Sequence, residues 1–201
     1  MGKIFYIIGK SSTGKDTILT RLLGDESLNL REIIQYTTRP MRAGETEGST
    51  YHFITDEQAD AFDAAGKLVE LRAYNTVHGV WKYMMVDDGQ VDLSANNYAA
   101  VGTIASYARV AKYYGNDLVV PIYIEVETGE RLQRALNRER THEGPKYAEM
   151  CRRFLADEAD FAPEKLEEAG LMQDGKIRNC FENIEIESCI EAICAFIRKH
   201  L

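Results

Sequence analysis

Apolar runs alternate with helical patterns along most of the chain. Short runs rich in β-branched and aromatic residues predict strands at about 3–8, 31–36, 98–104, 118–126 and 177–182. Apolar residues spaced three and four apart predict helices at about 15–24, 105–114, 128–139, 147–160 and 187–199. Strands that alternate with helices are typical of an α/β fold, with a central parallel sheet flanked by helices.

One segment interrupts this alternation. From Thr37 to Tyr83, glycine turns and short aromatic-rich strands replace the regular pattern, which predicts an inserted α+β lobe. The chain has 201 residues, enough for a single core that buries most of the surface of the unfolded chain. We therefore expect one domain, with a core at about 1–36 and 95–201 and the inserted lobe at about 37–94.

The turn after the first predicted strand has the composition of a phosphate-binding loop. Two glycines let the backbone wrap a polyphosphate, the helix N-terminus favours an anion, and Lys15 would reach the terminal phosphates. Asp16 separates Lys15 from Thr17, so the hydroxyl comes one position later than in the strict pattern. A plain glycine turn would leave the lysine unexplained. We expect ATP to be bound by Gly9, Lys10, Ser11, Ser12, Thr13, Gly14, Lys15, Asp16 and Thr17.

Charge is concentrated in one part of the chain. The formal net charge of −8 argues against a nucleic-acid binder, which would present a basic face. Between Arg131 and Arg153, however, seven basic residues stand against three acidic ones. Such a segment in an acidic protein predicts a site for a small anion, and a solvated helix face is the alternative.

Cysteine spacing and hydropathy bear on the compartment. Cys151, Cys180, Cys189 and Cys194 form no CxxC pair and have no histidine at metal-ligand spacing, so we expect small buried hydrophobic positions rather than zinc or disulfides. No stretch approaches the roughly 18 apolar residues of a membrane span. We expect a cytoplasmic protein that binds no membrane.

A second informative run follows the predicted strand at about 31–36. Arg39 and Arg42 lie three apart, and Tyr51 comes after a glycine turn. Paired arginines suit bidentate capture of a phosphate dianion, and the tyrosine adds a hydroxyl donor.

Together these motifs resemble the guanylate kinase family, in which G-x-x-x-x-G-K-x-S/T is followed by T-T-R-x-x-R-x-G-E and G-x-x-Y-x-F. The likeness runs from Lys3 to Tyr51, continues at Glu70 and resumes across the arginine segment to Phe161. It implies a P-loop kinase fold and transfer of the γ-phosphate of ATP to a nucleoside monophosphate, with GMP favoured. It also implies that Thr17 holds Mg²⁺. The acceptor would be bound by Thr37, Arg39, Arg42, Tyr51, Glu70 and His78.

The resemblance implies that Glu70 reads the base. A carboxylate can accept hydrogen bonds from the N1–H and the exocyclic amine of guanine, and adenine offers no such donor pair. An ordinary surface glutamate is the alternative. His78 stands where the family usually has a tyrosine, in a loop that is one residue shorter.

The chain departs from the family at the third core strand. The family has aspartates two apart there, whereas this chain has no acid from Ala99 to Ile104. This weakens the guanine assignment more than the kinase assignment. Asp87, Asp88 or Asp92 could replace those aspartates, and a solvated turn is the simpler expectation for them.

The arginine segment resembles the lid of nucleoside monophosphate kinases, at about 134–150. Arg134 and Arg138 lie four apart on one helix face, and Arg153 follows on the next helix, with Arg140 as the alternative to Arg138. Phosphoryl transfer depends on positioning and charge neutralisation rather than on a protein nucleophile. The catalytic residues would be Lys15, Arg39, Arg134, Arg138 and Arg153.

Two other functions are compatible with these motifs. One is a kinase of the same fold that acts on AMP, a pyrimidine nucleotide or a ribose phosphate. The other is a catalytically silent module that binds phosphorylated proteins through Arg39, Arg42 and Tyr51. The intact phosphate loop favours an enzyme. Both a monomer and a homodimer fit the sequence.

Overall fold

The core of the protein is a five-stranded parallel sheet. The computed structural model describes residues 1–42, 44–76 and 79–201. The core sheet has the strand order β11-β8-β1-β7-β2. Its strands are β1 (Ile4–Ile8), β2 (Leu30–Glu32), β7 (Asn97–Gly102), β8 (Val119–Glu125) and β11 (Cys180–Glu182). All paired strands in this sheet run parallel, so their carboxyl ends share one edge, the edge at which such sheets bind ligands.

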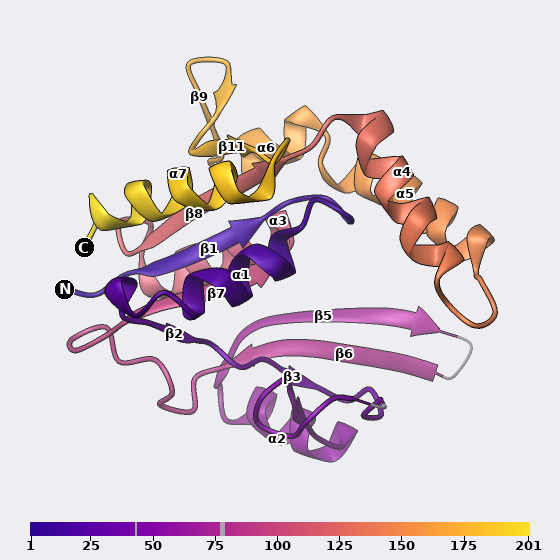
Figure 1. The fold of residues 1–201 in the computed structure, drawn as a ribbon. Coiled ribbons are helices and arrows are strands. Elements are labelled where there is room, and N and C mark those ends of the chain that lie inside the picture. The colour runs from indigo at the N-terminus through magenta and orange to yellow at the C-terminus, as the bar shows by residue number, and fades with distance from the viewer. Residues whose placement is uncertain (43, 77–78) are drawn as a thin grey trace.

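Helices cover both faces of the core sheet (Figure 1). Alternate residues of β1 point to opposite faces: Phe5 and Ile7 pack with α1 (Lys15–Leu23) and α7 (Ile186–Arg198). Tyr6 and the other residues of that parity pack with α3 (Ile104–Tyr114) and α6 (Pro163–Glu168). Because both faces are buried, the strand reads as a continuous apolar run in the sequence.

A second sheet lies below the core sheet in Figure 1. It has the order β4-β3-β6-β5, with strands β3 (Tyr36–Thr37), β4 (His52–Phe53), β5 (Leu68–Thr76) and β6 (Gly79–Val86). Its helix α2 (Asp56–Ala64) begins with a capping box between Thr55 and Gln58. This is the segment whose irregular pattern interrupts the alternation of strands and helices.

Most elements lie where the sequence places them, and two predicted strands are divided. The strand expected at 31–36 becomes β2 in the core sheet and β3 in the second sheet, because the chain crosses between the sheets there. The strand expected at 177–182 becomes β10 (Lys176–Ile177), which pairs with β9 (Met172–Gln173), and β11. Asn179 separates these two with a left-handed φ of 49°.

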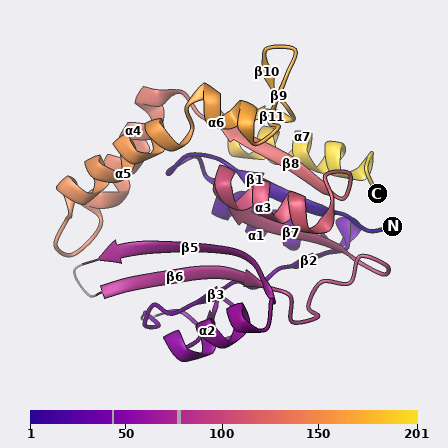
Figure 2. The same cartoon turned by 180° about the vertical axis from the view of Figure 1, so that it is seen from behind.

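Helices α4 (Thr128–Arg140) and α5 (Tyr147–Asp160) form an arm beyond the core sheet. Figures 1 and 2 show this arm at the end of the molecule where β1 points, opposite the two termini. The C-terminal end of β5 and the N-terminal end of β6 lie on the same side of the molecule as the arm. A short 3₁₀ helix, η1 (Glu26–Leu28), completes the fold. None of the helices in the described residues is long and apolar enough to cross a membrane.

Candidate active site

The phosphate loop (Gly9–Thr17) joins β1 to α1 at the carboxyl edge of the core sheet. Gly14 has a φ of 87°, and a Cβ there would lie 2.7 Å from Nδ2 of Asn183, so glycine is required on both counts. The first helical hydrogen bond runs from Ile18 N to Gly14 O, at 3.0 Å. Among the described residues, the backbone N–H groups of Gly14, Lys15 and Asp16 have no acceptor. They are free to bind an anion.

Two buried polar atoms at this loop lack a partner among the described residues. They are the Ser12 hydroxyl and the side-chain oxygen of Asn183. The Asn183 amide also donates to the Thr13 carbonyl oxygen at 2.8 Å, which ties the end of β11 to the loop. Buried polar atoms normally have partners, so a bound ligand fits here. Asn183 was not predicted from the sequence, although it follows a predicted strand at the carboxyl edge of the sheet.

An acidic pair from α5, Asp157 and Glu158, contacts the first half of the loop. Ser11 N donates to an Asp157 carboxylate oxygen at 2.7 Å, and Lys10 Nζ lies 2.8 Å from a Glu158 carboxylate oxygen. Arg131 pairs with both acids, is 1% exposed and stacks 4.1 Å from the Phe154 ring. The loop and the arm are therefore joined by an ion-pair network that the motif did not predict.

Two of the predicted lid arginines lie against the loop. Arg138 and Arg153 line a small hollow together with Ser11 and Ser12, and Arg140 is not among its lining residues. Arg134 is held differently, because its Nε donates to Glu130 at 2.9 Å and its Nη2 to the backbone oxygen of Asn183 at 3.0 Å. The structure thus brings Arg138 and Arg153 of the arm to the loop.

Lys15 and Thr17 occupy the first turn of α1. Lys15 is half-buried, and no carboxylate among the described residues lies within ion-pair distance of it. Thr17 is exposed. Within the same residues, no group of three or more histidine, cysteine, aspartate or glutamate side chains is arranged to hold a metal ion.

Arg39, one of the two arginines expected to bind the acceptor, is buried in the second sheet at 3% exposure. Its Nη2 and Nη1 atoms lie 2.7 and 2.9 Å from the two Glu45 carboxylate oxygens, and its Nε donates to the Tyr83 hydroxyl at 3.2 Å. The hydrogen bonds from Arg39 lower the pKa of Glu45 to about 2, and a backbone N–H bond from Arg42 adds to this.

The other predicted acceptor residues differ in how accessible they are. Arg42 is exposed, with its guanidinium carbon 6.0 Å from the Trp81 ring centroid. Tyr51 packs 5.6 Å from the Arg39 guanidinium, and burial raises the pKa of its hydroxyl. Thr37 is fully buried and donates to the Lys82 carbonyl oxygen at 2.9 Å. His78 lies outside the described residues.

Glu70 is also buried, and its carboxylate is bound by Arg72, which the sequence did not single out. The three aspartates considered as replacements for the family's acids are engaged locally. Asp88 accepts from the Tyr36 hydroxyl at 2.5 Å, Asp87 from Tyr113 at 2.8 Å and Asp92 from Ser94.

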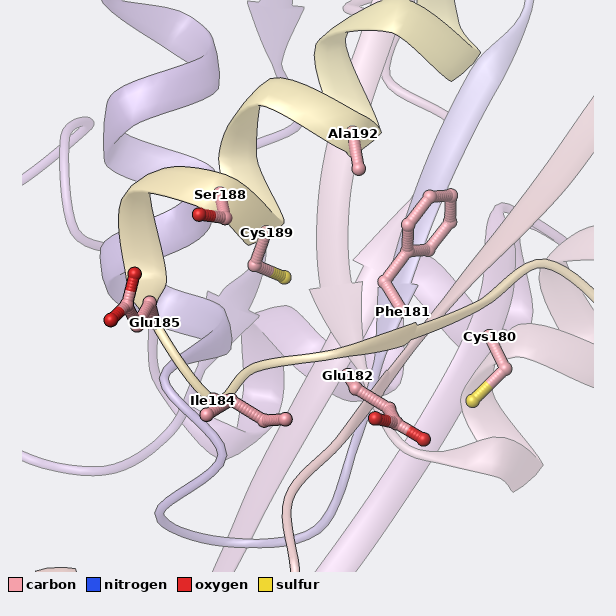
Figure 3. Close-up of a pocket in the computed structure, with 8 residues that line it drawn as sticks. All are labelled: Cys180, Phe181, Glu182, Ile184, Glu185, Ser188, Cys189 and Ala192. Atoms are coloured by element: carbon pink, nitrogen blue, oxygen red, sulfur yellow. The ribbon is translucent and has the colours of Figure 1, made fainter.

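A hollow of about 460 Å³ lies between β11 and α7 (Figure 3). None of the predicted site residues lines it; its walls are Cys180, Phe181, Glu182, Ile184, Glu185, Ser188, Cys189 and Ala192. Although Cys180 is exposed as a residue, partial desolvation of its thiol and the neighbouring Glu125 raise the pKa of that thiol to about 12. All four cysteines are free: Cys189 and Cys194 are buried as expected, whereas Cys151 and Cys180 are exposed.

Comparison with known proteins adds to this geometry. Residues 1–81 match the model of the family described as "Guanylate kinase". A protein named guanylate kinase from Mycoplasmoides gallisepticum is 43% identical over 79 residues, which cover 39% of this chain and 40% of that protein. One from Neisseria gonorrhoeae is 36% identical over 100 residues, covering 50% of this chain and 46% of that protein. Residues 1–81 of this chain are therefore similar to guanylate kinases.

The rest of the chain is similar in fold. The crystal structure of guanylate kinase from Anaplasma phagocytophilum superposes with a TM-score of 0.63 at 19% identity, over 99% of this chain and 86% of that one. The expected P-loop kinase fold is therefore confirmed. In sequence, the matches span less than half the length of these curated guanylate kinases.

Proposed function

We propose that the chain transfers the γ-phosphate of ATP to a nucleoside monophosphate, with GMP favoured, and releases ADP and GDP. The observation that carries this proposal is the convergence of the phosphate loop with Arg138 and Arg153 of the arm. A loop with free N–H groups binds a polyphosphate, and cations brought to it neutralise the charge that develops during transfer. The match of residues 1–81 to guanylate kinases supports the favoured acceptor.

In the proposed reaction, an oxygen of the acceptor phosphate attacks the γ-phosphorus of ATP. The bond between that phosphorus and the oxygen that joins it to the β-phosphate breaks, and the electron pair of this bond leaves with ADP. Lys15 and the N–H groups of the loop hold the donor phosphates, and Arg138 and Arg153 close over them. The acceptor is a dianion, so no protein base is required.

The polar groups of the loop are also compatible with binding of ATP and Mg²⁺. The unpartnered Ser12 hydroxyl and Asn183 oxygen provide buried sites for ligand hydrogen bonds. The Thr17 hydroxyl supplies a hard oxygen, the type of ligand that Mg²⁺ prefers, so Thr17 would hold the ion, which would neutralise negative charge on the donor phosphates. We propose that the second sheet is the acceptor-binding lobe and that the segment at about 134–150 is the lid. We also propose that the enzyme is cytoplasmic.

The test is a coupled ADP-release assay with ATP and Mg²⁺ against GMP, dGMP, AMP, CMP, UMP and ribose phosphates. Turnover selective for GMP supports the proposal. Turnover selective for AMP, a pyrimidine nucleotide or a ribose phosphate supports a kinase of the same fold with a different acceptor. Absence of ADP release with every acceptor, from a protein that is folded, would support a binding module instead.

A further inference from the structure

The acceptor sheet contains a buried ion pair at the position expected to read the base. Glu70 and Arg72 are two residues apart on β5, so their side chains share one face of the strand. Arg72 Nε lies 3.2 and 3.1 Å from the two Glu70 carboxylate oxygens, and Arg72 Nη2 lies 2.9 Å from one of them. The carboxylate is bound by its own neighbour.

Gln35 extends this pair toward the core sheet. Arg72 Nη2 also donates to the Gln35 side-chain oxygen at 2.7 Å, and the Gln35 amide donates to the Val101 carbonyl oxygen at 3.0 Å. Val101 belongs to β7, the strand on which the family's aspartates are missing. The three side chains are therefore fixed between the two sheets.

Exposure distinguishes the two charged groups. The Glu70 side chain is 0% exposed, whereas the Arg72 side chain is 18% exposed. A base that approaches this pair meets the guanidinium first. It can reach the carboxylate only after displacing hydrogen bonds from a charged donor, which are stronger than those that neutral N–H groups of a base would supply.

We propose that Arg72, rather than Glu70, is the specificity-determining residue for the base, and that it donates to a base carbonyl oxygen. The inference rests on the proposed function. A guanidinium has only donors, so it favours the O6 carbonyl of guanine or hypoxanthine and disfavours the 6-amino group of adenine. The 2-amino group of guanine, which a free carboxylate would read, is not recognised. The acceptors are 6-oxopurine monophosphates, GMP and IMP alike.

The experiment measures kcat/KM for GMP, IMP and AMP with the full chain and saturating ATP. The wild type is expected to use GMP and IMP within about 10-fold of each other and AMP about 100-fold less well, which is the discrimination that one or two charge-assisted hydrogen bonds supply. Arg72→Ala should narrow the preference for IMP over AMP by about 10-fold or more, because the carbonyl loses its donor.

Glu70→Gln is the second variant, since it keeps the shape of the side chain. If Glu70 only positions Arg72, the substitution lowers kcat/KM for GMP and IMP by the same factor. Arg198→Ala removes an exposed arginine that pairs with Asp25, away from β5, and is the matched control with unchanged ratios.

Two results would overturn the inference in distinguishable ways. A wild-type preference for GMP over IMP of about 100-fold that Glu70→Gln abolishes would show that the carboxylate reads guanine directly, and it would leave the proposed kinase function intact. Absence of ADP release with every nucleotide from a folded wild-type chain would overturn the kinase proposal and this inference with it.

Discussion

In the phosphate loop, Lys15 and the N–H groups of the first turn of α1 have no partner among the described residues, whereas in the second sheet Arg39 and Arg72 are held by carboxylates. The loop is built from backbone geometry and one unpaired cation, so a motif describes it well. In the second sheet, residue type alone says little, because Arg39 and Arg72 are each neutralised by a neighbouring carboxylate. The same residue types therefore carry different information in the two regions.

The largest effect on activity is expected from Lys15→Ala. We expect kcat for ADP release to fall by about 100-fold or more, because the unpaired lysine is the loop's main cation for the developing charge. Lys112→Ala, at an exposed position of α3, is the matched control. Turnover within severalfold of the wild type in Lys15→Ala would contradict the assigned role of the loop.

The ion-pair network behind the loop predicts a large loss of stability. Arg131→Ala should lower the free energy of unfolding by about 3 to 5 kcal/mol, because it leaves Asp157 and Glu158 without their buried partner. Arg152→Ala breaks the pair with Glu149, whose two side chains are 65% and 46% exposed, and should cost less than about 1 kcal/mol. Urea unfolding measures both, and equal losses would show that the network is not a buried one.

Substitutions of Arg39 and Arg42, the two arginines proposed to bind the acceptor, should have different effects. Arg42→Ala is expected to lower kcat/KM for the acceptor by about 10- to 100-fold through a charge-assisted contact to phosphate, with stability changed by less than about 0.5 kcal/mol. Arg39→Ala should instead lower the free energy of unfolding, because Glu45 loses its partner. Paired kinetic and unfolding measurements test this division, and a large loss of stability in Arg42→Ala would contradict it.

Glu45 is expected to make the stability of the fold depend on pH. Its pKa is about 2 in the fold and 4.5 ordinarily, so the unfolded state binds its proton first as the pH falls. The stabilisation by Arg39 is therefore complete above about pH 4.5 and is lost as the pH falls toward 2. Glu45→Gln should flatten this part of the stability curve in acid unfolding experiments. An unchanged slope would show that the pair contributes nothing.

Residue spacing predicted most of the helices and strands, because these elements depend mainly on residues that are close together in the chain. The helix expected at about 147–160 is α5, and the apolar run at the N-terminus is the central strand β1. The divided strand at 31–36 was not predictable from hydrophobicity, since both halves are strand-like and only the crossing between sheets separates them. Arg72 could have been noticed, because residues two apart on a strand share a face.

Periodicity and short motifs were sufficient to predict the α/β fold, the phosphate loop and the list of candidate cations. Which of these cations are available to a ligand depends on contacts between residues far apart in the chain. The contacts of Ser11 with Asp157 and of Thr13 with Asn183 join residues that are 146 and 170 positions apart. Whether a charge is paired or free depends on its neighbours in space, and these are set by packing of the sheets and of the α4–α5 arm.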